Sequence, residues 1–324
     1  MGPILRVVDL HKDFPIKGGG RRDRHRLVRA VDGVDLEIAR GEAFGIVGES
    51  GSGKTTLARL MLRLVEPTSG QIYFEDREIT SFGPREMKEL RRHMQMVFQD
   101  PYGSLDPRKT VYSLIAEPLA VHKASPDRAS RIRRVEECLG LVELPTSEHF
   151  MAKVPDELSG GERQRVGIAR ALVLGPEFIL ADEPVSMLDA SVKAGITDLM
   201  VHLREKIGLT YVFITHEIAL ANYICDRIAV MYLGKIVEIG SAAEIIGAPL
   251  HQYTKLLMEA IPPLYPDEEW GRSIPERGEF PFSIERPAGC RFHPRCPNAL
   301  ELCTEKEPDL VDVGGGHFVA CHTW

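Results

Sequence analysis

The chain has 324 residues, of which 44% are hydrophobic and 27% charged, with a formal net charge of −7. This composition is ordinary for a globular protein, and the negative charge excludes a general attraction to nucleic acid or anionic lipid. No apolar run approaches the roughly 20 residues of a membrane span, and the acid-containing start does not match a secretory signal. We therefore expect a cytosolic protein with one large domain or two smaller ones.

The first elements are expected to be strands. Residues 4–9 form an apolar, β-prone run that Phe14 follows, and residues 28–38 alternate between apolar and polar positions. Between them, the basic and glycine-rich segment 17–26 predicts an exposed loop. A nucleic-acid patch is the weaker interpretation of this segment, because no aromatic residues are interleaved with the basic ones.

A glycine-rich loop follows. Residues 48–56 read GESGSGKTT between the strand-like run 43–47 and the helical run 57–64. Such glycines let backbone N–H groups point at phosphate oxygens, and the helix start adds partial positive charge. Lys54 is placed to reach the β and γ phosphates, and Thr55 to bind Mg²⁺. The strand before the loop and the helix after it distinguish the motif from a chance glycine-rich turn.

Strands and helices then alternate along the chain. Predicted strands cover 71–74, 94–98, 177–182 and 210–215, predicted helices cover 111–144 and 190–206, and residues 227–239 predict a hairpin that turns near Leu233–Gly234. This alternation predicts a mixed α/β core with a largely parallel sheet, interrupted by a helical insertion. Near Ile261 the chain becomes proline-rich and acidic, and we place a domain boundary there.

Two further motifs predict phosphate chemistry. Asp182 and Glu183 end an apolar strand, where Asp182 is placed to hold Mg²⁺ and Glu183 to act as general base on a water attacking the γ-phosphate. A simple helix cap is the alternative for this acidic pair, and the phosphate loop favours the functional interpretation. Ser159, Gly160 and Gly161 begin another helix and predict a second anion-binding site.

These motifs together resemble the ATP-binding subunit of an ATP-binding cassette (ABC) transporter. GESGSGKTT resembles the Walker A loop, FILADE the Walker B strand, and LSGGERQR the signature motif of that family. Gln99 matches the Q-loop, His216 the switch histidine, and Ser186–Asp189 the D-loop, in which Met187 stands where alanine is usual. The resemblance covers about residues 4–260.

The resemblance implies a fold and a domain organisation. The implied fold is an α/β P-loop NTPase cassette with a RecA-like core, an N-terminal antiparallel β subdomain, a helical insertion and a small cysteine-containing C-terminal extension. The ATPase domain would cover residues 1–260, with its helical subdomain at about 100–172 and the extension at 261–324.

The resemblance also implies roles for individual residues. It assigns catalysis to Glu183, His216, Lys54 and Gln99, and Mg²⁺ binding to Thr55, Gln99 and Asp182. It assigns nucleotide contacts to Phe14, Gly48, Glu49, Ser50, Gly51, Ser52, Gly53, Lys54, Thr55, Thr56, Ser159, Gly160, Gly161 and Asp189. Because two cassettes pair head to tail in this family, Ser159–Gly161 are expected to contact the ATP held by the partner. Phe14 is the candidate for stacking on adenine, with ordinary edge packing as the alternative.

A narrower resemblance concerns the transported substrate. Residues 94–107, 250–254 and 289–297 are similar to the oligopeptide, dipeptide and nickel importer branch, and most of all to its second ATPase subunit. This implies an ATPase that energises peptide uptake, with nickel or oligosaccharide import as alternatives. A soluble ABC ATPase of translation or DNA repair and a catalytically silent regulatory cassette are the rivals.

The implied partners are a second ABC ATPase subunit, two transmembrane permease subunits and an extracytoplasmic substrate-binding protein, without nucleic acid. The second ATPase is expected to be a distinct paralogue, or otherwise a second copy of this chain. The implied location is the cytoplasmic face of the inner membrane, where the protein would be peripheral.

Four cysteines gather in the C-terminal extension. Intervals of five, six and seventeen residues separate Cys290, Cys296, Cys303 and Cys321. Four thiolates can hold a [4Fe–4S] cluster or a zinc ion, and zinc sites usually contain closely spaced pairs, which are absent here. Some members of the importer branch carry an iron–sulfur cluster at such cysteines, so a [4Fe–4S] cluster is the favoured expectation. Spare ligands would be His293, His317 and His322, while Cys138 and Cys225 are expected to be small buried hydrophobes.

Overall fold

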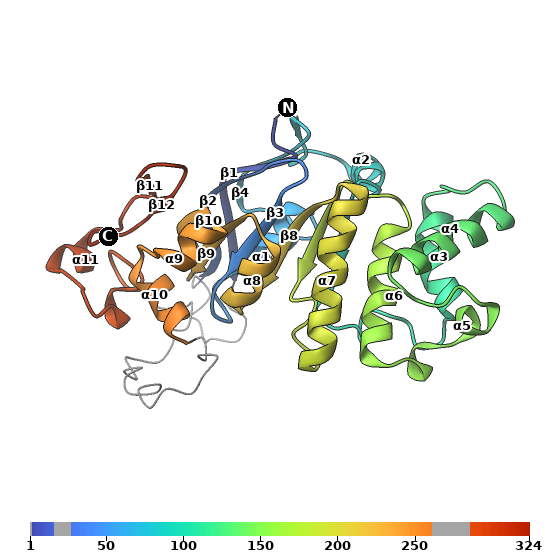
Figure 1. The fold of residues 1–324 in the computed structure, drawn as a ribbon. Helices are drawn as coiled ribbons and strands as arrows, with labels where there is room; N and C mark the ends of the chain where they lie inside the picture. Colours follow the sequence, from blue (N-terminus) through green and yellow to red (C-terminus); the bar gives the residue numbers. More distant parts are fainter. Residues whose placement is uncertain (1, 16–26, 261–285) are drawn as a thin grey trace, which may run out of the picture. The chain divides into compact units, whose positions relative to one another are not determined.

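The computed structural model describes residues 2–15, 27–260 and 286–324 (Figure 1). The predicted loop at 17–26 and the predicted domain boundary at Ile261 lie outside these described residues. The chain divides into two compact units. Of the described residues, the first unit comprises 2–4, 39–43 and 75–214, and the second comprises 5–15, 27–38, 44–74, 215–260 and 286–324.

The first unit contains a parallel sheet. Its strands β6 (Met94–Val97), β7 (Phe178–Asp182) and β8 (Thr210–Thr215) pair side by side, with Met94 opposite Phe178 and Phe178 opposite Thr210. Every residue of β7 and β8 is buried, as is typical of parallel strands with both faces covered. The predicted strands at 94–98, 177–182 and 210–215 and their parallel arrangement are therefore confirmed.

The first unit also carries most of the helices. They are α2 (Pro84–Leu90), α3 (Val111–Val121), α4 (Arg128–Leu141), α5 (Glu148–Ala152), the 3₁₀ turn η1 (Pro155–Glu157), α6 (Gly160–Leu172) and α7 (Ala190–Ile207), with the short strand β5 (Arg77–Glu78) before them. Helix α3 packs against α4, α5 and α6, and α4 also packs against α6. The green helices α3 to α5 form the helical insertion that the sequence predicted (Figure 1).

The structure divides the helical run predicted at 111–144. Helix α3 ends at Val121, and Lys123 then adopts a left-handed backbone conformation with φ 50°. Helix α4 begins at Arg128, after Asp127 accepts a hydrogen bond of 2.8 Å from the Ser130 N–H. A left-handed residue and a new N-cap together end one helix and start another, so periodicity alone predicted a longer element than forms.

The second unit begins with an antiparallel sheet in the order β2 (Leu27–Ile38), β1 (Leu5–Pro15) and β4 (Ser69–Phe74). Leu5 lies opposite Ile38 on one side and Phe74 on the other. Leu5, Val7 and Leu10 of β1 are buried, which places them in the core. The expected N-terminal antiparallel β subdomain is confirmed, and Figure 1 shows these strands side by side in blue.

A second group of paired strands in this unit joins the strand before the glycine-rich loop to the C-terminal part of the chain. Strand β3 (Ala43–Val47) runs parallel to β9 (Arg227–Tyr232), and β9 turns at Leu233–Gly234 into β10 (Lys235–Ser241), which confirms the predicted hairpin. Strand β12 (Phe318–Val319) pairs with β10 and with β11 (Val311–Asp312). The C-terminal residues therefore extend the sheet that carries β3.

The remaining helices of the second unit are α1 (Lys54–Met61), α8 (Ile218–Ile224), α9 (Ala242–Gly247), α10 (Gln252–Glu259), the 3₁₀ turn η2 (His293–Arg295) and α11 (Glu301–Glu305). Within 2–15, 27–260 and 286–324, none of the helices has the length and apolar character needed to cross a membrane.

Candidate nucleotide-binding site

The glycine-rich loop joins the buried strand β3 to the start of α1, as the sequence predicted. At Gly48 and Gly53, backbone atoms of neighbouring segments come very close to the loop. A Cβ atom at Gly48 would lie 2.2 Å from the Met231 carbonyl oxygen, and a Cβ at Gly53 would lie 2.1 Å from the Ala30 carbonyl oxygen. Gly53 also has φ 106° and is the N-cap of α1. Both positions therefore require glycine, because a side chain would clash with the backbone of a neighbouring strand.

Lys54 is held against this loop. Its ammonium group donates to the carbonyl oxygens of Gly48, at 2.6 Å, and Glu49, at 2.9 Å. The side chain is almost completely buried, while Ser50 and Gly51 at the tip of the loop are exposed. Carbonyl oxygens thus fix the cation at the start of α1, where the backbone N–H groups of a helix favour an anion such as phosphate.

Thr55 lies in the first turn of α1, and Asp182 ends β7 with 3% of its surface exposed. The Thr55 hydroxyl, the Asp182 carboxylate and the Gln99 amide are the predicted Mg²⁺ ligands. All three supply oxygen, which is the donor that Mg²⁺ prefers, so the residues present fit this ion by their chemistry.

In the first unit, the structure brings Gln99 and Glu183 together. The Gln99 amide donates to Glu183 Oε2 at 3.1 Å. Glu183 has φ 44°, a left-handed conformation that is uncommon for a residue with a side chain, and its N–H donates to the Ile214 carbonyl at 3.0 Å. The ladder between β7 and β8 therefore continues one residue beyond the strand and fixes the backbone of the predicted general base.

Ser159 is the N-cap of α6, as its sequence position predicted. Its hydroxyl accepts from the Glu162 N–H at 3.3 Å, and Glu162 accepts from the Ser159 N–H at 2.8 Å. This hydrogen bond from the Ser159 backbone lowers the pKa of Glu162. The reciprocal pair is a capping box, which orders the exposed start of the helix where Gly160 and Gly161 lie.

Asp189 caps α7 in a similar way. Its carboxylate accepts from the Val192 N–H at 3.0 Å and from the Ser191 hydroxyl at 2.7 Å. The hydrogen bond from the Val192 backbone lowers the pKa of Asp189. Met187, the unusual residue of the predicted D-loop, is exposed two residues earlier and leaves this cap unaffected.

The second unit holds two more predicted residues. His216 follows β8, and about half of its side chain is exposed, with Nε2 at 3.9 Å from Glu217 Oε1. Phe14 lies near the end of β1 and is 38% exposed, with the Lys12 ammonium 5.0 Å from the centre of its ring. An exposed ring beside a cation is available to stack on a base, and stacking on adenine stays a prediction beside the alternative of ordinary edge packing.

The tail cysteines occupy one region of the second unit. Burial raises the pKa of the Cys290 thiol to about 11, opposed by a hydrogen bond from the Phe292 backbone, and the other three tail cysteines add small electrostatic contributions to it. The Cys290 N–H donates to the Cys303 carbonyl at 2.8 Å. Across the described part of the chain, however, no group of three or more His, Cys, Asp or Glu side chains is arranged to hold a metal ion. The arrangement of these thiols therefore does not by itself fit a metal centre.

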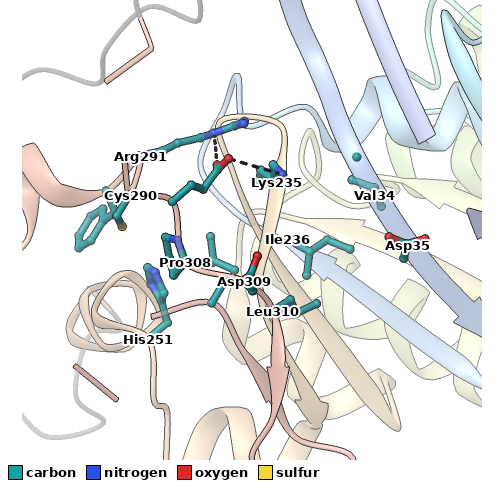
Figure 2. Close-up of a pocket in the computed structure, with 15 residues that line it drawn as sticks. Val34, Asp35, Lys235, Ile236, His251, Cys290, Arg291, Pro308, Asp309 and Leu310 are labelled. Carbon is teal, nitrogen blue, oxygen red and sulfur yellow. Dashed lines mark ion pairs between the residues drawn. The ribbon is translucent and has the colours of Figure 1, made fainter. Parts of the chain in front are cut away.

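A cavity of about 360 Å³ also lies in the second unit (Figure 2). Cys290 lines it, together with Arg291 and Glu307 of the tail and Lys235 of β10. None of the residues predicted to bind the nucleotide lines this cavity. It is a gap between the tail and the β structure, and its charged lining is largely paired internally, since Glu307 contacts both Arg291 and Lys235.

Sequence reasoning missed two residues that contact the phosphate loop. The Tyr253 hydroxyl accepts from the Glu49 N–H at 2.7 Å, and the Arg295 guanidinium binds the Glu49 carboxylate. Both residues lie in segments that the importer resemblance had singled out, 250–254 and 289–297. The importer resemblance therefore identified the two segments, but it did not predict that they contact the phosphate loop.

Comparison with known proteins decides the family. A family model described as "ABC transporter" matches residues 31–186, and one described as "Oligopeptide/dipeptide transporter, C-terminal region" matches residues 237–303. The oligopeptide transport ATP-binding protein AppF of Bacillus subtilis is 45% identical over 323 residues, covering 99% of this chain and 97% of that protein. This chain belongs to the ABC transporter ATPase family.

Other relatives agree with this assignment. A Brucella ovis protein, whose name contains the words peptide import ATP-binding protein, is 44% identical over 98% of this chain and 97% of its own length. The solved cassette MJ0796, bound to ADP and Pi, is 32% identical, with a TM-score of 0.65 over 74% of this chain and 98% of that one. CbiO1 of Clostridium perfringens is 28% identical, with a TM-score of 0.66 over 76% of this chain and 92% of that one.

The family assignment confirms the predicted P-loop cassette fold and the ATPase class. An ABC ATPase binds ATP with Mg²⁺, and as part of a transporter it works with membrane permease subunits. The segments that resemble the Walker A loop, the Q-loop, the signature motif and the Walker B strand all lie inside the matched range 31–186, while Asp189 and His216 lie beyond it.

Proposed function

We propose that this ATPase energises the uptake of di- and oligopeptides through a membrane ABC importer. One observation carries the proposal: an ABC cassette and the C-terminal region described for oligopeptide and dipeptide transporters occur in the same chain. A relative named for oligopeptide transport matches along nearly the whole length of both proteins. Nickel and oligosaccharide import are the alternatives within the same branch.

The site residues take the following roles in this proposal. Lys54 and the N–H groups of Gly48–Thr56 bind the phosphates, and the exposed ring of Phe14 stacks on adenine. Thr55, Asp182 and Gln99 hold Mg²⁺, which supplies positive charge to the phosphates. Glu183 accepts the proton of the attacking water, and His216 contacts the γ-phosphate.

The hydrogen bond between Gln99 and Glu183 supports a coupling role for Gln99. The amide nitrogen of Gln99 holds the general base, and its amide oxygen is the predicted Mg²⁺ ligand. We infer that Mg²⁺ bound at this oxygen repositions the amide and so signals γ-phosphate occupancy through the loop after Gln99 to the permease subunits. Phe98 and Tyr102, on either side of Gln99, leave apolar surface exposed, as a contact with a partner subunit would need.

The proposal includes domains and partners. The ATPase domain covers residues 1–260, with a helical subdomain at about 100–172, and residues 261–324 form the extension. A second ATPase, expected to be a distinct paralogue, pairs head to tail with this one, so that Ser159, Gly160, Gly161 and Asp189 complete its nucleotide site. Two permease subunits and an extracytoplasmic binding protein complete an importer at the cytoplasmic face of the inner membrane.

Uptake by cells tests the substrate. A strain that lacks this gene is expected to lose uptake of labelled di- and oligopeptides, and the wild-type gene should restore it whereas Lys54→Ala and Glu183→Gln should not. Labelled nickel and an oligosaccharide serve as the other two substrates. Unchanged peptide uptake in the deletion strain, with loss of either alternative, would reassign the substrate without touching the ATPase assignment.

The [4Fe–4S] cluster stays a separate proposal, supported by the presence of four cysteines in the tail and not by their arrangement in the described residues. The test is the visible absorption spectrum and the iron and zinc content of anaerobically purified protein. Stoichiometric iron with a broad absorption band supports the cluster, and stoichiometric zinc replaces it with a structural zinc site. Absence of both metals rejects a metal site at these cysteines.

A further inference from the structure

A residue near the C-terminal end of the chain binds the Walker A loop. Arg295 Nη1 donates to Glu49 Oε2 at 2.7 Å, and Arg295 Nη2 donates to Glu49 Oε1 at 2.9 Å. Both residues belong to the second unit, and only 13% of the arginine side chain and 30% of the glutamate side chain are exposed. Two parallel hydrogen bonds between a guanidinium and a carboxylate fix the angle of the pair as well as its distance.

An aromatic cluster holds Arg295 in place. Its guanidinium lies 5.9 Å from the centre of the Tyr232 ring and 5.8 Å from that of Phe292. These two rings are 5.4 Å apart in an edge-on arrangement, and Tyr253 packs against both, at 4.6 and 5.5 Å. Because Tyr253 and Phe292 are fully buried, the arginine has a fixed support from which to reach the loop.

Glu49 connects this support to the phosphate-binding lysine. Its carboxylate binds Arg295, its N–H donates to the Tyr253 hydroxyl at 2.7 Å, and its carbonyl accepts from the Lys54 ammonium at 2.9 Å. All three polar parts of one residue are therefore engaged. Any movement of the Glu49 backbone would move a hydrogen-bond partner of Lys54.

Arg295 also has an electrostatic effect, because Glu49 is negatively charged. A loop that binds the phosphates of ATP carries a carboxylate at its second position, and an unpaired carboxylate there would repel the ligand. Arg295 offsets this negative charge at hydrogen-bond distance. The partly buried setting screens the repulsion less than water would, so the pairing is expected to affect phosphate binding.

We propose that Arg295 is a positioning residue of the nucleotide site, which orients the Walker A loop through Glu49 and cancels the repulsion between Glu49 and the phosphates of ATP. The inference rests on the ATP-binding function proposed above. It also gives the tail a role at that site, because Arg295 lies in η2 between Cys290 and Cys296, where the Cys296 N–H donates to the His293 carbonyl at 3.2 Å.

The test is the affinity for a fluorescent ATP analogue in matched variants. We expect Arg295→Gln to bind it about tenfold more weakly, because an unpaired carboxylate then faces the phosphates. Arg295→Lys keeps the charge without the two-bond geometry and should lose less. In the double variant Glu49→Gln/Arg295→Gln the repelling charge is gone, so its affinity should return to within about threefold of wild type.

Arg286→Gln is the control, because Arg286 is another partly buried tail arginine of the same unit but pairs with Asp32 rather than with the loop. Thermal unfolding of each variant verifies that it folds. If Arg295→Gln does not fold, the affinity of the double variant still tests the inference. Wild-type affinity in Arg295→Gln would overturn the inference, and a double variant as weak as Arg295→Gln would overturn its electrostatic part, in which Arg295 cancels the charge of Glu49. A wild-type protein that binds no ATP analogue would instead reject the proposed function.

Discussion

At the scale of single residues, the backbone of the Walker A loop depends on glycine at position 53. We predict that Gly53→Ala loses measurable ATP binding and is less stable, because φ 106° is unfavourable for alanine and its Cβ would lie 2.1 Å from the Ala30 carbonyl oxygen. The control is Gly167→Ala, inside α6 with open space around its Cβ position. That change should stabilise the protein by up to about 1 kcal/mol. Urea unfolding and ATP titration of both variants measure the contrast, and similar behaviour of the two would refute the prediction.

The residues that the sequence could identify are those with a local signature. Gly48, Gly53 and Lys54 occur in a motif whose flanking strand and helix are contiguous with it, so the pattern alone predicted their arrangement. Arg295 lies 246 positions from Glu49, and no periodicity or local motif links them. A contact of that kind depends on how β9, α10 and the tail pack together. This long-range packing has no local sequence pattern from which it could be predicted.

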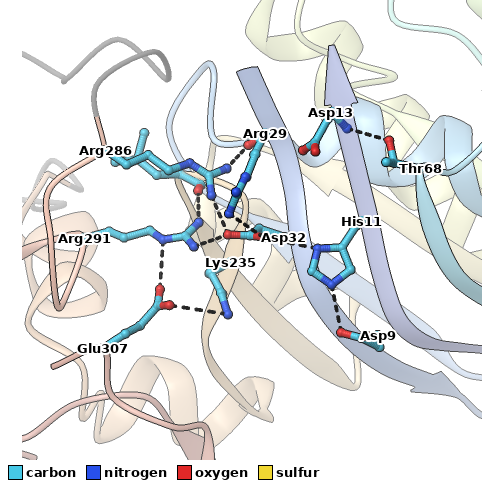
Figure 3. Close-up of polar contacts among 11 residues, drawn as sticks. Asp9, His11, Asp13, Arg29, Asp32, Thr68, Lys235, Arg286, Arg291 and Glu307 are labelled. Atoms are coloured by element: carbon cyan, nitrogen blue, oxygen red, sulfur yellow. Dashed lines mark hydrogen bonds and ion pairs between the residues drawn. The ribbon is translucent and has the colours of Figure 1, made fainter. Parts of the chain in front are cut away.

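At the scale of elements, ion pairs fasten the tail to strand β2 (Figure 3). Asp32 of β2 binds both Arg286, at 2.5 Å, and Arg291, and Arg291 also binds Glu307 at 2.9 Å. Burial alone would raise the pKa of Asp32, but the hydrogen bonds and charges of the two arginines lower it to about 2. The folded state therefore favours the ionised carboxylate relative to the unfolded chain.

This pKa shift predicts how stability depends on pH. The folded pKa of Asp32 is depressed, so the stabilisation is present above the unfolded value of 3.8 and is lost as the pH falls toward 2. The contribution is about 2 kcal/mol from the size of the shift. In Asp32→Asn this part of the pH dependence between 4 and 2 should be absent in urea unfolding. An identical acid dependence in the variant and the wild type would contradict the assignment.

Element types were more predictable than element ends. Short apolar runs predicted the parallel strands, and the turn expected near Leu233–Gly234 predicted the 227–239 hairpin, which the structure contains. The break between α3 and α4 was not predicted, because helical periodicity continues through it while Lys123 and the Asp127 cap interrupt the backbone. Pairing of β12 with β10 was also missed, since two residues of strand carry too little pattern to recognise.

At the scale of the whole molecule, ATP binding should stabilise the folded protein. A ligand at a hundred times its dissociation constant adds about 2.7 kcal/mol to the free energy of unfolding, which raises the melting temperature by several degrees. We predict this shift for the wild type and its loss in Lys54→Ala. The control Lys206→Ala removes an exposed lysine in the last turn of α7 and should keep the shift. If ATP raised the melting temperature of the two lysine variants equally, Lys54 would not be a nucleotide-binding residue.

The measurement that tests the central claim most directly is ATP hydrolysis by wild type and Glu183→Gln under the same conditions, with Mg²⁺ and any partner subunits that the wild type requires. Glutamine keeps the size of the side chain and a hydrogen-bonding group for Gln99 but cannot accept the proton of water. We predict that the variant still binds ATP and hydrolyses it at least about a hundredfold more slowly. Hydrolysis at the wild-type rate by Glu183→Gln would contradict the assignment of this residue as the general base of a transport ATPase.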